Sequence, residues 1–383
     1  MDLTLSGEHE TLRATVEDFA RKEVAPVIGE LYERGEFPYE IVAKMGAMGL
    51  FGLPFDEEYG GMGGDYFALC LALEELARVD SSVAITLEAG VSLGAMPIYR
   101  FGSEEQKREW LPALVAGERL GAFGLTEPGG GSDAGATRTT ARLDGDEWVI
   151  NGSKAFITNS GTDITSVVTV TAITGGTDGA GRREISAIMV PAGTPGFRVS
   201  QKYSKVGWSA SDTRELFFDD CRVPAANLLG QRGRGYAQFL SILDEGRIAI
   251  AALSVGLAQG CVDESVRYAH EREAFGSPIG SYQAIQFKIA DMEARAHTAR
   301  LAYYAAAARM LAGEPFKKEA AIAKLVSSNA AMDNARDATQ VFGGYGFMNE
   351  YPVGRFYRDA KILEIGEGTS EVQRMLIARQ LGL

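Results

Sequence analysis

Apolar residues recur at helical spacing through roughly the first 120 residues. Ser6 can cap a helix whose apolar positions run from Leu12 to Val24, and Pro26 is expected to interrupt that helix. Pro38 can open a second helix that carries apolar positions as far as Met48. Residues 67–77 predict a third helix, and the glycine-rich run 60–64 predicts a loop before it.

Between about residues 121 and 230 the pattern changes to short runs of β-branched and aromatic residues. Residues 148–150 and 155–158 flank Asn151-Gly152, a pairing typical of a β-hairpin with a tight turn. Residues 167–171, 185–190 and 215–218 are further candidate strands. A β-rich domain is therefore expected between helical ones.

From about residue 235 the chain is rich in alanine and follows a long helical pattern. Helices are predicted over 235–272, 282–312, 315–342 and 367–381, and short connections favour an antiparallel bundle. The prediction is a multidomain α+β protein with an N-terminal all-α domain (1–120), a middle β-barrel or sandwich-like domain (121–230) and a C-terminal four-helix bundle (231–383).

Composition narrows the function classes. The net charge of −13 and pI near 4.9 argue against a surface for nucleic acid or anionic membrane. The cysteines and histidines form no pattern of metal ligands, so no metal is expected. The N-terminus does not resemble a secretory signal, and no apolar run was expected to approach the length of a membrane span. These features predict a cytoplasmic protein.

A short run near the C-terminus carries candidate chemistry. Glu367 stands between Gly366 and Gly368, where its neighbours add only backbone, so a partly shielded carboxylate could act as a general base. The alternative is an ordinary helix start, with Thr369 or Ser370 as N-cap and Glu367 and Glu371 near the positive end of the helix dipole.

Two glycine-rich segments could approach a ligand. Residues 126–133 could present backbone N–H groups to a phosphate, although they match neither a Walker loop nor a Rossmann fingerprint. Residues 340–346 end a helix in glycines, which could also leave room for a cofactor. A plain turn and a helix C-cap are the respective alternatives.

Taken in order, six segments closely resemble the acyl-CoA dehydrogenase family, and the resemblance covers essentially the whole chain. They are residues 124–133 (GLTEPGGGSD), 156–158 (FIT), 272–276 (REAFG), 340–344 (QVFGG), 357–361 (YRDAK) and 367–371 (EGTSE). The resemblance implies a flavoprotein with FAD held between subunits of a homotetramer, built as a dimer of dimers.

The resemblance also implies roles for individual residues. Those expected beside the flavin ring and its pyrophosphate are Phe123, Leu125, Thr126, Ser132, Phe156 and Thr158. Phe156 stands where relatives often have tryptophan. Those expected to reach the FAD of a neighbouring subunit are Arg272, Phe275, Gln283, Gln340, Gly343 and Gly344, with Thr369 and Glu371 at the adenosine and phosphate end. Arg272 could instead form a surface ion pair with Glu271 or Glu273.

The implied reaction converts an acyl-CoA thioester to the trans-2-enoyl-CoA. Glu367 would take the α-proton, the β-hydride would pass to flavin N5, and the electrons would pass to electron-transfer flavoprotein. Asp244, Arg247, Gly368 and Ser132 are the expected substrate contacts, while an ion pair within its own helix is the alternative for Arg247.

Two departures from the family pattern affect this prediction. Some relatives carry the base immediately before the arginine that corresponds to Arg247, but this chain has Gly246 there, which favours Glu367. Many relatives have tyrosine where this chain has Gly366, which predicts extra space for a branched, bulkier or longer acyl group. Ile85, Thr86 and Ala89 lie on the segment that resembles the lining of the acyl tail.

Other activities remain open from the sequence. An acyl-CoA oxidase or flavin monooxygenase of the same fold is disfavoured by chain length and by the presence of Glu367, respectively. A dehydrogenase acting on an acyl-carrier-protein thioester is not excluded. A non-catalytic scaffold is the least favoured, because Glu367, Thr126 and Thr158 are all present.

Overall fold

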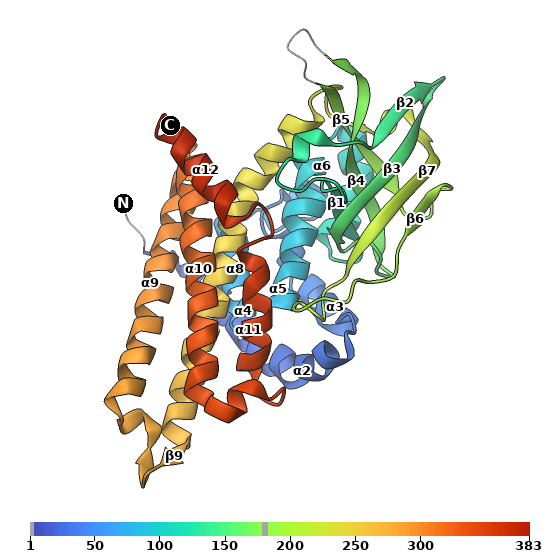
Figure 1. Cartoon of the computed structure of the whole chain (residues 1–383). Helices are drawn as coiled ribbons and strands as arrows, with labels where there is room; N and C mark the ends of the chain where they lie inside the picture. Colours follow the sequence, from blue (N-terminus) through green and yellow to red (C-terminus); the bar gives the residue numbers. More distant parts are fainter. Residues whose placement is uncertain (1–3, 178–182) are drawn as a thin grey trace.

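The computed structural model describes residues 4–177 and 183–383. Helices precede and follow the strands along the chain, as predicted, and in space the two helical parts pack together beside a curled sheet (Figure 1). The predicted fold class is confirmed. The N-terminal helices are α1 (Gly7–Phe19), α2 (Ala25–Arg34), α3 (Tyr39–Ala47), α4 (Tyr66–Ala77), α5 (Ser81–Glu88), α6 (Met96–Phe101) and α7 (Glu104–Val115).

The first helix does not stop at Pro26 as expected. Ser6 caps α1 by accepting a hydrogen bond from the backbone N–H of His9 at 3.2 Å. A π-helical segment, Ala20–Val24, then joins α1 to α2, and Pro26 lies in the first turn of α2. The wider π turn accommodates a residue that has no N–H to donate, so the helical rod continues.

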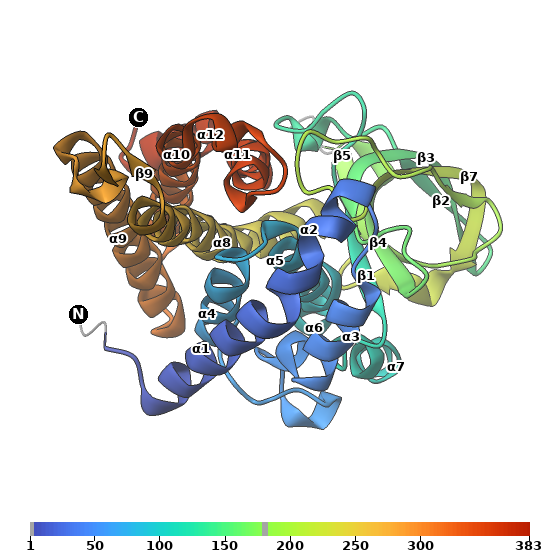
Figure 2. The same cartoon turned by 90° about the horizontal axis from the view of Figure 1, so that it is seen from below.

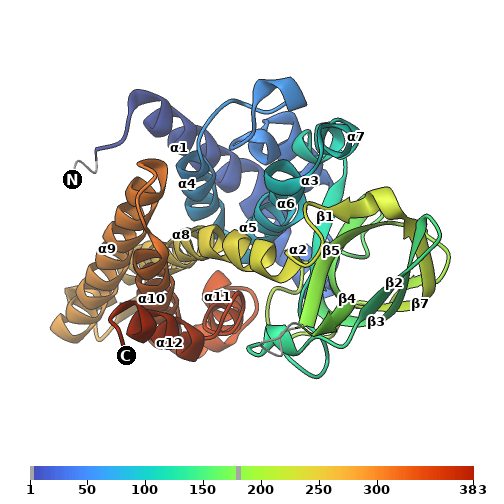
Figure 3. The same ribbon diagram turned by 90° about the horizontal axis from the view of Figure 1, so that it is seen from above.

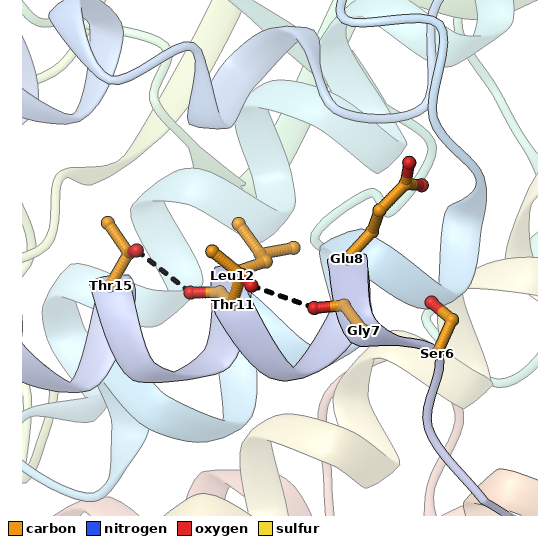
Figure 4. Close-up of a pocket in the computed structure, with 6 residues that line it drawn as sticks. All are labelled: Ser6, Gly7, Glu8, Thr11, Leu12 and Thr15. Atoms are coloured by element: carbon orange, nitrogen blue, oxygen red, sulfur yellow. Dashed lines mark hydrogen bonds between the residues drawn. The ribbon is translucent and has the colours of Figure 1, made fainter.

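A shallow depression on the outside of α1 is formed by this one helix and contains none of the candidate residues (Figure 4). It is lined by Ser6, Gly7, Glu8, Thr11, Leu12 and Thr15.

The middle part is one eight-stranded sheet with the order β6-β7-β3-β2-β4-β5-β8, in which β1 also pairs with β4 in parallel. Its strands are β1 (Leu120–Gly124), β2 (Thr140–Asp144), β3 (Glu147–Thr158), β4 (Thr165–Thr177), β5 (Arg183–Pro191), β6 (Phe197–Val199), β7 (Thr213–Pro224) and β8 (Leu228–Leu229). Seen from above, the strands curl around an apolar core of their own (Figure 3).

The hairpin turn predicted at Asn151-Gly152 is wrong. β3 runs unbroken through both residues, and its pairing with β7 shifts register at this point. The Asn151 side chain instead exchanges two hydrogen bonds with Asp220 of β7, at 2.9 and 3.0 Å. A Cβ at Gly152 would lie 2.7 Å from Thr139 Cα, so glycine is needed there for close packing at a bulge. The actual turn is Gly145-Asp146, between β2 and β3.

The C-terminal part is built on three long helices, with two shorter ones packed on α10 (Figure 2). These are α8 (Gly235–Glu271), α9 (Gln283–Leu311), α10 (Lys317–Phe342), α11 (Pro352–Leu363) and α12 (Ser370–Gln380), with a small hairpin of β9 (Glu273–Ala274) and β10 (Ser277–Pro278) between α8 and α9. The sequence prediction did not include α11, although its buried positions from Val353 to Leu363 follow helical spacing. The last helix begins at Ser370 rather than at residue 367.

In the described part of the chain, one helical stretch, Ser81–Phe101, is long and apolar enough to cross a membrane, contrary to the expectation from sequence. However, 94% of its most apolar window is buried within the protein. Burial of this kind is typical of a core helix, and the stretch comprises α5, a π-helical segment (Ala89–Ala95) and α6.

A buried carboxylate joins the three parts of the chain. Asp359 on α11 accepts hydrogen bonds from the Tyr32 hydroxyl at 2.5 Å, the Ser81 hydroxyl at 2.7 Å and the Trp208 backbone N–H at 2.6 Å. Tyr32 and Ser81 belong to the N-terminal helices, and Trp208 belongs to the loop before β7. We call these four residues the Asp359 junction; it fixes the start of α5, the helix whose other end reaches the candidate site.

Candidate active site

Glu367 lies in the loop between α11 and α12, with a left-handed backbone φ of 50°. For a residue with a side chain this conformation costs about 1–3 kcal/mol, and it persists only where the surroundings impose it. The backbone next to Glu367 is fixed by two hydrogen bonds, because Lys324 Nζ and Gln373 Nε2 each donate to the Gly368 carbonyl at 2.8 Å. Both carboxyl oxygens of Glu367 are buried, with no hydrogen-bond donor among the described residues.

The helix-start alternative for this segment is also present in the structure. The Thr369 hydroxyl caps α12 by accepting a hydrogen bond from the Val372 backbone N–H at 3.3 Å, and Glu371 is exposed in the first turn. The cap belongs to Thr369, however, and it leaves the Glu367 carboxyl free to point into the protein.

Helix α8 faces the Glu367 carboxyl with a glycine. A Cβ at Gly246 would lie 2.5 Å from Glu367 Oε2, so the carboxyl occupies the space that a side chain there would need. The next residue, Arg247, is buried and pairs with Asp244, which also lies 3.3 Å from Lys317 Nζ. The ion pair within the helix is therefore present, and the Arg247 charge still acts on Glu367.

The sequence analysis missed a second carboxyl in this site. Glu88, the last residue of α5, is fully buried, and its oxygens also have no hydrogen-bond donor among the described residues. Its Oε1 lies 3.9 Å from the same Cβ position at Gly246, so both carboxyls flank one glycine. The sequence did contain a signal for Glu88, because it is the only charged residue between Asp80 and Arg100. A glutamate in so apolar a segment is expected to be buried, and glutamates are rarely buried without a reason.

Burial dominates the electrostatics of the site. It raises the pKa of Glu367, while the neighbouring Glu88 carboxyl and the charges of Lys324 and Arg247 offset part of that rise. The pKa of Glu88 lies well above its ordinary value, through burial first and the Glu367 charge second. Burial also lowers the pKa of Lys324 to about 8. A carboxylate with a raised pKa is a stronger base, as proton abstraction from carbon requires.

The glycine-rich segment 126–133 follows β1 and rests on a buried ion pair. Lys154 Nζ donates to Glu127 Oε1 at 2.8 Å and to the Leu125 carbonyl at 3.3 Å. Phe123 on β1 stacks on Phe239 of α8, with ring centroids 3.8 Å apart, which ties the sheet to the bundle. These contacts fix the loop from below.

Thr126 and Ser132 lie at the accessible side of this loop, since Thr126 is half-buried and Ser132 is exposed. A Cβ at Gly129 would meet no atom within 4 Å, so the loop is open on that side.

Phe156 and Thr158 lie on β3 beside this loop. The backbone N–H of Ala155 donates to the Thr126 carbonyl at 2.9 Å, so the two segments predicted to bind the flavin ring are in contact. The Phe156 side chain is 67% exposed, and its backbone is left-handed with φ of 61°. An exposed aromatic ring held on strained backbone is suited to stacking against a flat ligand.

Six other predicted cofactor residues lie at the end of the bundle marked by β9, opposite to α12 (Figure 1). They are Arg272, Phe275, Gln283, Gln340, Gly343 and Gly344. The Phe275 side chain is 98% exposed. Among the described residues Arg272 forms no ion pair with Glu271 or Glu273; its guanidinium instead lies 5.8 Å from the centroid of the Tyr345 ring.

These residues therefore do not form one site with Glu367 within a single chain. Thr369 and Glu371 lie at the α12 end, apart from them. The arrangement fits the expectation that this exposed set serves a cofactor in a neighbouring subunit.

The open face beside β1 and β3 fits FAD. The exposed Phe156 ring suits a flat ring system, and the open glycine loop at the side of β1 suits a pyrophosphate. Proton abstraction next to a carbonyl, coupled to hydride transfer, is the chemistry that a buried base paired with FAD can support.

Comparisons with known proteins agree with this arrangement. Models of the N-terminal, middle and C-terminal domains of acyl-CoA dehydrogenase match residues 6–118, 122–221 and 233–382. The probable acyl-CoA dehydrogenase YngJ of Bacillus subtilis is 51% identical over 381 residues, covering 100% of both chains.

Two solved structures are also very similar. Butyryl-CoA dehydrogenase from Megasphaera elsdenii has a TM-score of 0.96 at 43% identity, covering 100% of both chains. A chain in the structure of the electron transferring flavoprotein of Acidaminococcus fermentans has a TM-score of 0.95 at 43% identity, covering 100% of this chain and 99% of that chain.

Proposed function

This chain belongs to the acyl-CoA dehydrogenase family, and from that premise we propose that Glu367 removes the α-proton of an acyl-CoA thioester as the trans-2,3 double bond forms. Family membership makes the chain an oxidoreductase that dehydrogenates acyl-CoA. The observation that carries the role of Glu367 is its buried carboxyl, held on strained backbone and without a hydrogen-bond donor among the described residues.

The residues around Glu367 favour this role. Burial strengthens the base, and the charges of Lys324 and Arg247 favour its ionised form. No described residue accepts a hydrogen bond from the backbone N–H of Glu367, which leaves that donor for the thioester oxygen as negative charge develops there. Asp244 and Arg247, on the same face of α8, are proposed to hold the thioester end of the CoA group.

We propose that FAD is the redox cofactor of this site. When bound, FAD accepts the hydride that leaves the β-carbon. Phe156 and Thr158 would pack against its ring, and the loop with Thr126 and Ser132 would hold the ring edge and pyrophosphate. The exposed set from Arg272 to Gly344 would complete the FAD site of a neighbouring subunit, so a homotetramer built as a dimer of dimers is part of this proposal.

We propose a short or branched acyl group as substrate. The Megasphaera relative acts on butyryl-CoA, which supports a short chain. Gly366 adds space near the reacting carbons, and a Cβ there would make only ordinary contacts, at 3.4 Å from the Ile362 carbonyl oxygen. The similarity to a chain in an electron transferring flavoprotein structure supports such a flavoprotein as the electron acceptor.

The test is anaerobic mixing of the purified protein with a panel of acyl-CoAs of short, long, branched and aromatic chains, while the visible absorbance of the flavin is followed. Rapid bleaching by short or branched acyl-CoAs is expected. The variant Glu367→Gln should retain FAD and bind substrate but lose bleaching by about 10²–10⁴-fold. Full bleaching in that variant would remove Glu367 as the base.

The same panel separates the other activities. A yellow protein that no acyl-CoA bleaches, but that an acyl-carrier-protein thioester does, would replace CoA with a carrier. Rapid reoxidation of the bleached flavin by oxygen, without electron-transfer flavoprotein, would identify an oxidase.

A further inference from the structure

Glu88 and Glu367 form a pair of buried carboxyls that must satisfy each other. All four oxygens are buried, and none has a hydrogen-bond donor from another described residue. The two carboxyls are neighbours on either side of the space left by Gly246, because Glu367 Oε2 lies 2.5 Å and Glu88 Oε1 lies 3.9 Å from the Cβ position of that glycine. Two carboxylates cannot bond to one another, so a single shared proton is what would satisfy the pair.

The charges around the pair decide which carboxyl holds that proton. Lys324 and Arg247 both stabilise negative charge on Glu367, whereas burial and the negative charge of Glu367 itself are the main influences on Glu88. Ser92, whose hydroxyl shares a hydrogen bond with the Tyr66 hydroxyl at 2.8 Å, gives Glu88 only a weak neutral contact. Tyr66 and Cys70 on α4 also lie near Glu88, and Glu245 on α8, which lies near Tyr66, is paired with Arg100. None of these groups places a positive charge beside Glu88.

We propose that Glu88 stays protonated and donates a hydrogen bond to the Glu367 carboxylate, so that a neutral acid holds the catalytic base in position. Glu88 is a positioning residue, since it acts through Glu367. The inference rests on the proposed function only for the role of Glu367 as base. The proton on Glu88 is a property of the free protein.

The arrangement gives the reaction an alkaline limit. Bleaching rises with pH as Glu367 ionises and then falls when Glu88 loses its proton, because the donor disappears and two negative charges repel each other in a buried site. The wild-type rate is therefore bell-shaped in pH. Lys324, whose pKa burial lowers to about 8, also titrates on the alkaline side, so the limb that belongs to Glu88 is the one that changes when Glu88 is replaced.

Two variants of Glu88 separate the proton from the hydrogen bond. Glu88→Gln keeps an N–H donor that never ionises, so we expect bleaching near the wild-type rate and loss of the alkaline limb. Glu88→Leu keeps similar volume but removes the donor, so the acid limb should shift upward by about one to two pH units. FAD content and melting temperature, measured for each variant, separate these shifts from misfolding.

The inference is overturned if both variants keep the wild-type alkaline limb, or if Glu88→Gln shifts the acid limb as far as Glu88→Leu does. If no thioester bleaches even the wild type, the proposed function fails and a second measurement still decides about Glu88. Isotope-edited infrared titration of the free protein should show one glutamic acid protonated well above pH 7, which Glu88→Gln removes. Absence of that protonated group in the wild type would refute the inference by itself.

Discussion

The substitution Gly246→Ala tests the geometry of the base with one added methyl group. The new Cβ would lie 2.5 Å from Glu367 Oε2, whereas ordinary contact begins near 3.4 Å. Because the obstructed atom is the end of a side chain, the carboxyl can yield, but it has to move by about 0.9 Å. Misplacement of a catalytic group by about 1 Å costs on the order of 10²-fold in rate.

The same substitution should not weaken the fold. Gly246 lies inside α8, where alanine stabilises a helix by about 0.5–1 kcal/mol relative to glycine. The expected signature is therefore a bleaching rate reduced by about 10²-fold, with unchanged FAD content and equal or higher melting temperature. Gly29→Ala is the matched control, since it adds a methyl inside α2 at an ordinary 3.6 Å from Arg355 Nη1.

Single-turnover bleaching under anaerobic conditions is the assay, because it isolates proton and hydride removal from later electron transfer. Wild-type bleaching by the Gly246→Ala variant would show that the Glu367 carboxyl is not confined against α8. A variant that is slow and also markedly less stable would show that the methyl group disturbs the helix packing, and the argument from carboxyl displacement would fail.

Three further predictions concern other parts of the molecule. Lys154→Met leaves Glu127 buried without its cation and should lower the free energy of unfolding by about 3–5 kcal/mol in denaturant titrations; a loss below 1 kcal/mol would contradict the role of this pair under the glycine-rich loop. Burial lowers the pKa of Lys205 to about 7, so between pH 7 and 10 the unfolded chain still binds a proton that the folded chain has released. The free energy of unfolding of the wild type, relative to Lys205→Met, should therefore rise with pH by up to about 1.4 kcal/mol per pH unit. A difference between the two proteins that does not change with pH would refute this. Gly366→Tyr should narrow the acyl site and reduce bleaching by branched or longer acyl-CoAs more than by butyryl-CoA; an equal change for all substrates would remove Gly366 as a determinant of acyl specificity.

Much of the fold follows from local sequence patterns. Helix α8 was expected at 235–272 and spans 235–271, because its alanine-rich helical pattern is a local signal. The prediction of a turn at Asn151-Gly152 was wrong because a bulge and a turn favour the same residue types. Only the pairing of Asn151 with Asp220 in the folded sheet distinguishes the two. The helical continuation past Pro26 follows a π-helical segment, Ala20–Val24, that the spacing of apolar residues did not predict.

The candidate site divides in the same way. Glu367 could be predicted because its glycine-flanked segment is distinctive, although the roles given to it and to the cofactor residues stay predictions. Glu88 could not be assigned a role, because a single glutamate in an apolar helix has no motif. Only the folded arrangement brings it beside Gly246 and Glu367, from a position more than 150 residues earlier in the chain.

The Asp359 junction has a consequence for how the protein is made. Asp359 is the acceptor for donors at residues 32, 81 and 208, so everything up to β7 leaves the ribosome before its buried partner exists. A chain that stops short of residue 359 buries up to three unsatisfied donors, each costing about 1–3 kcal/mol. The helical and sheet parts are therefore not separable modules. A nonsense mutation in the last tenth of the gene but before codon 359, or an excised N-terminal fragment, should leave a product that proteases clear although most of its sequence is intact.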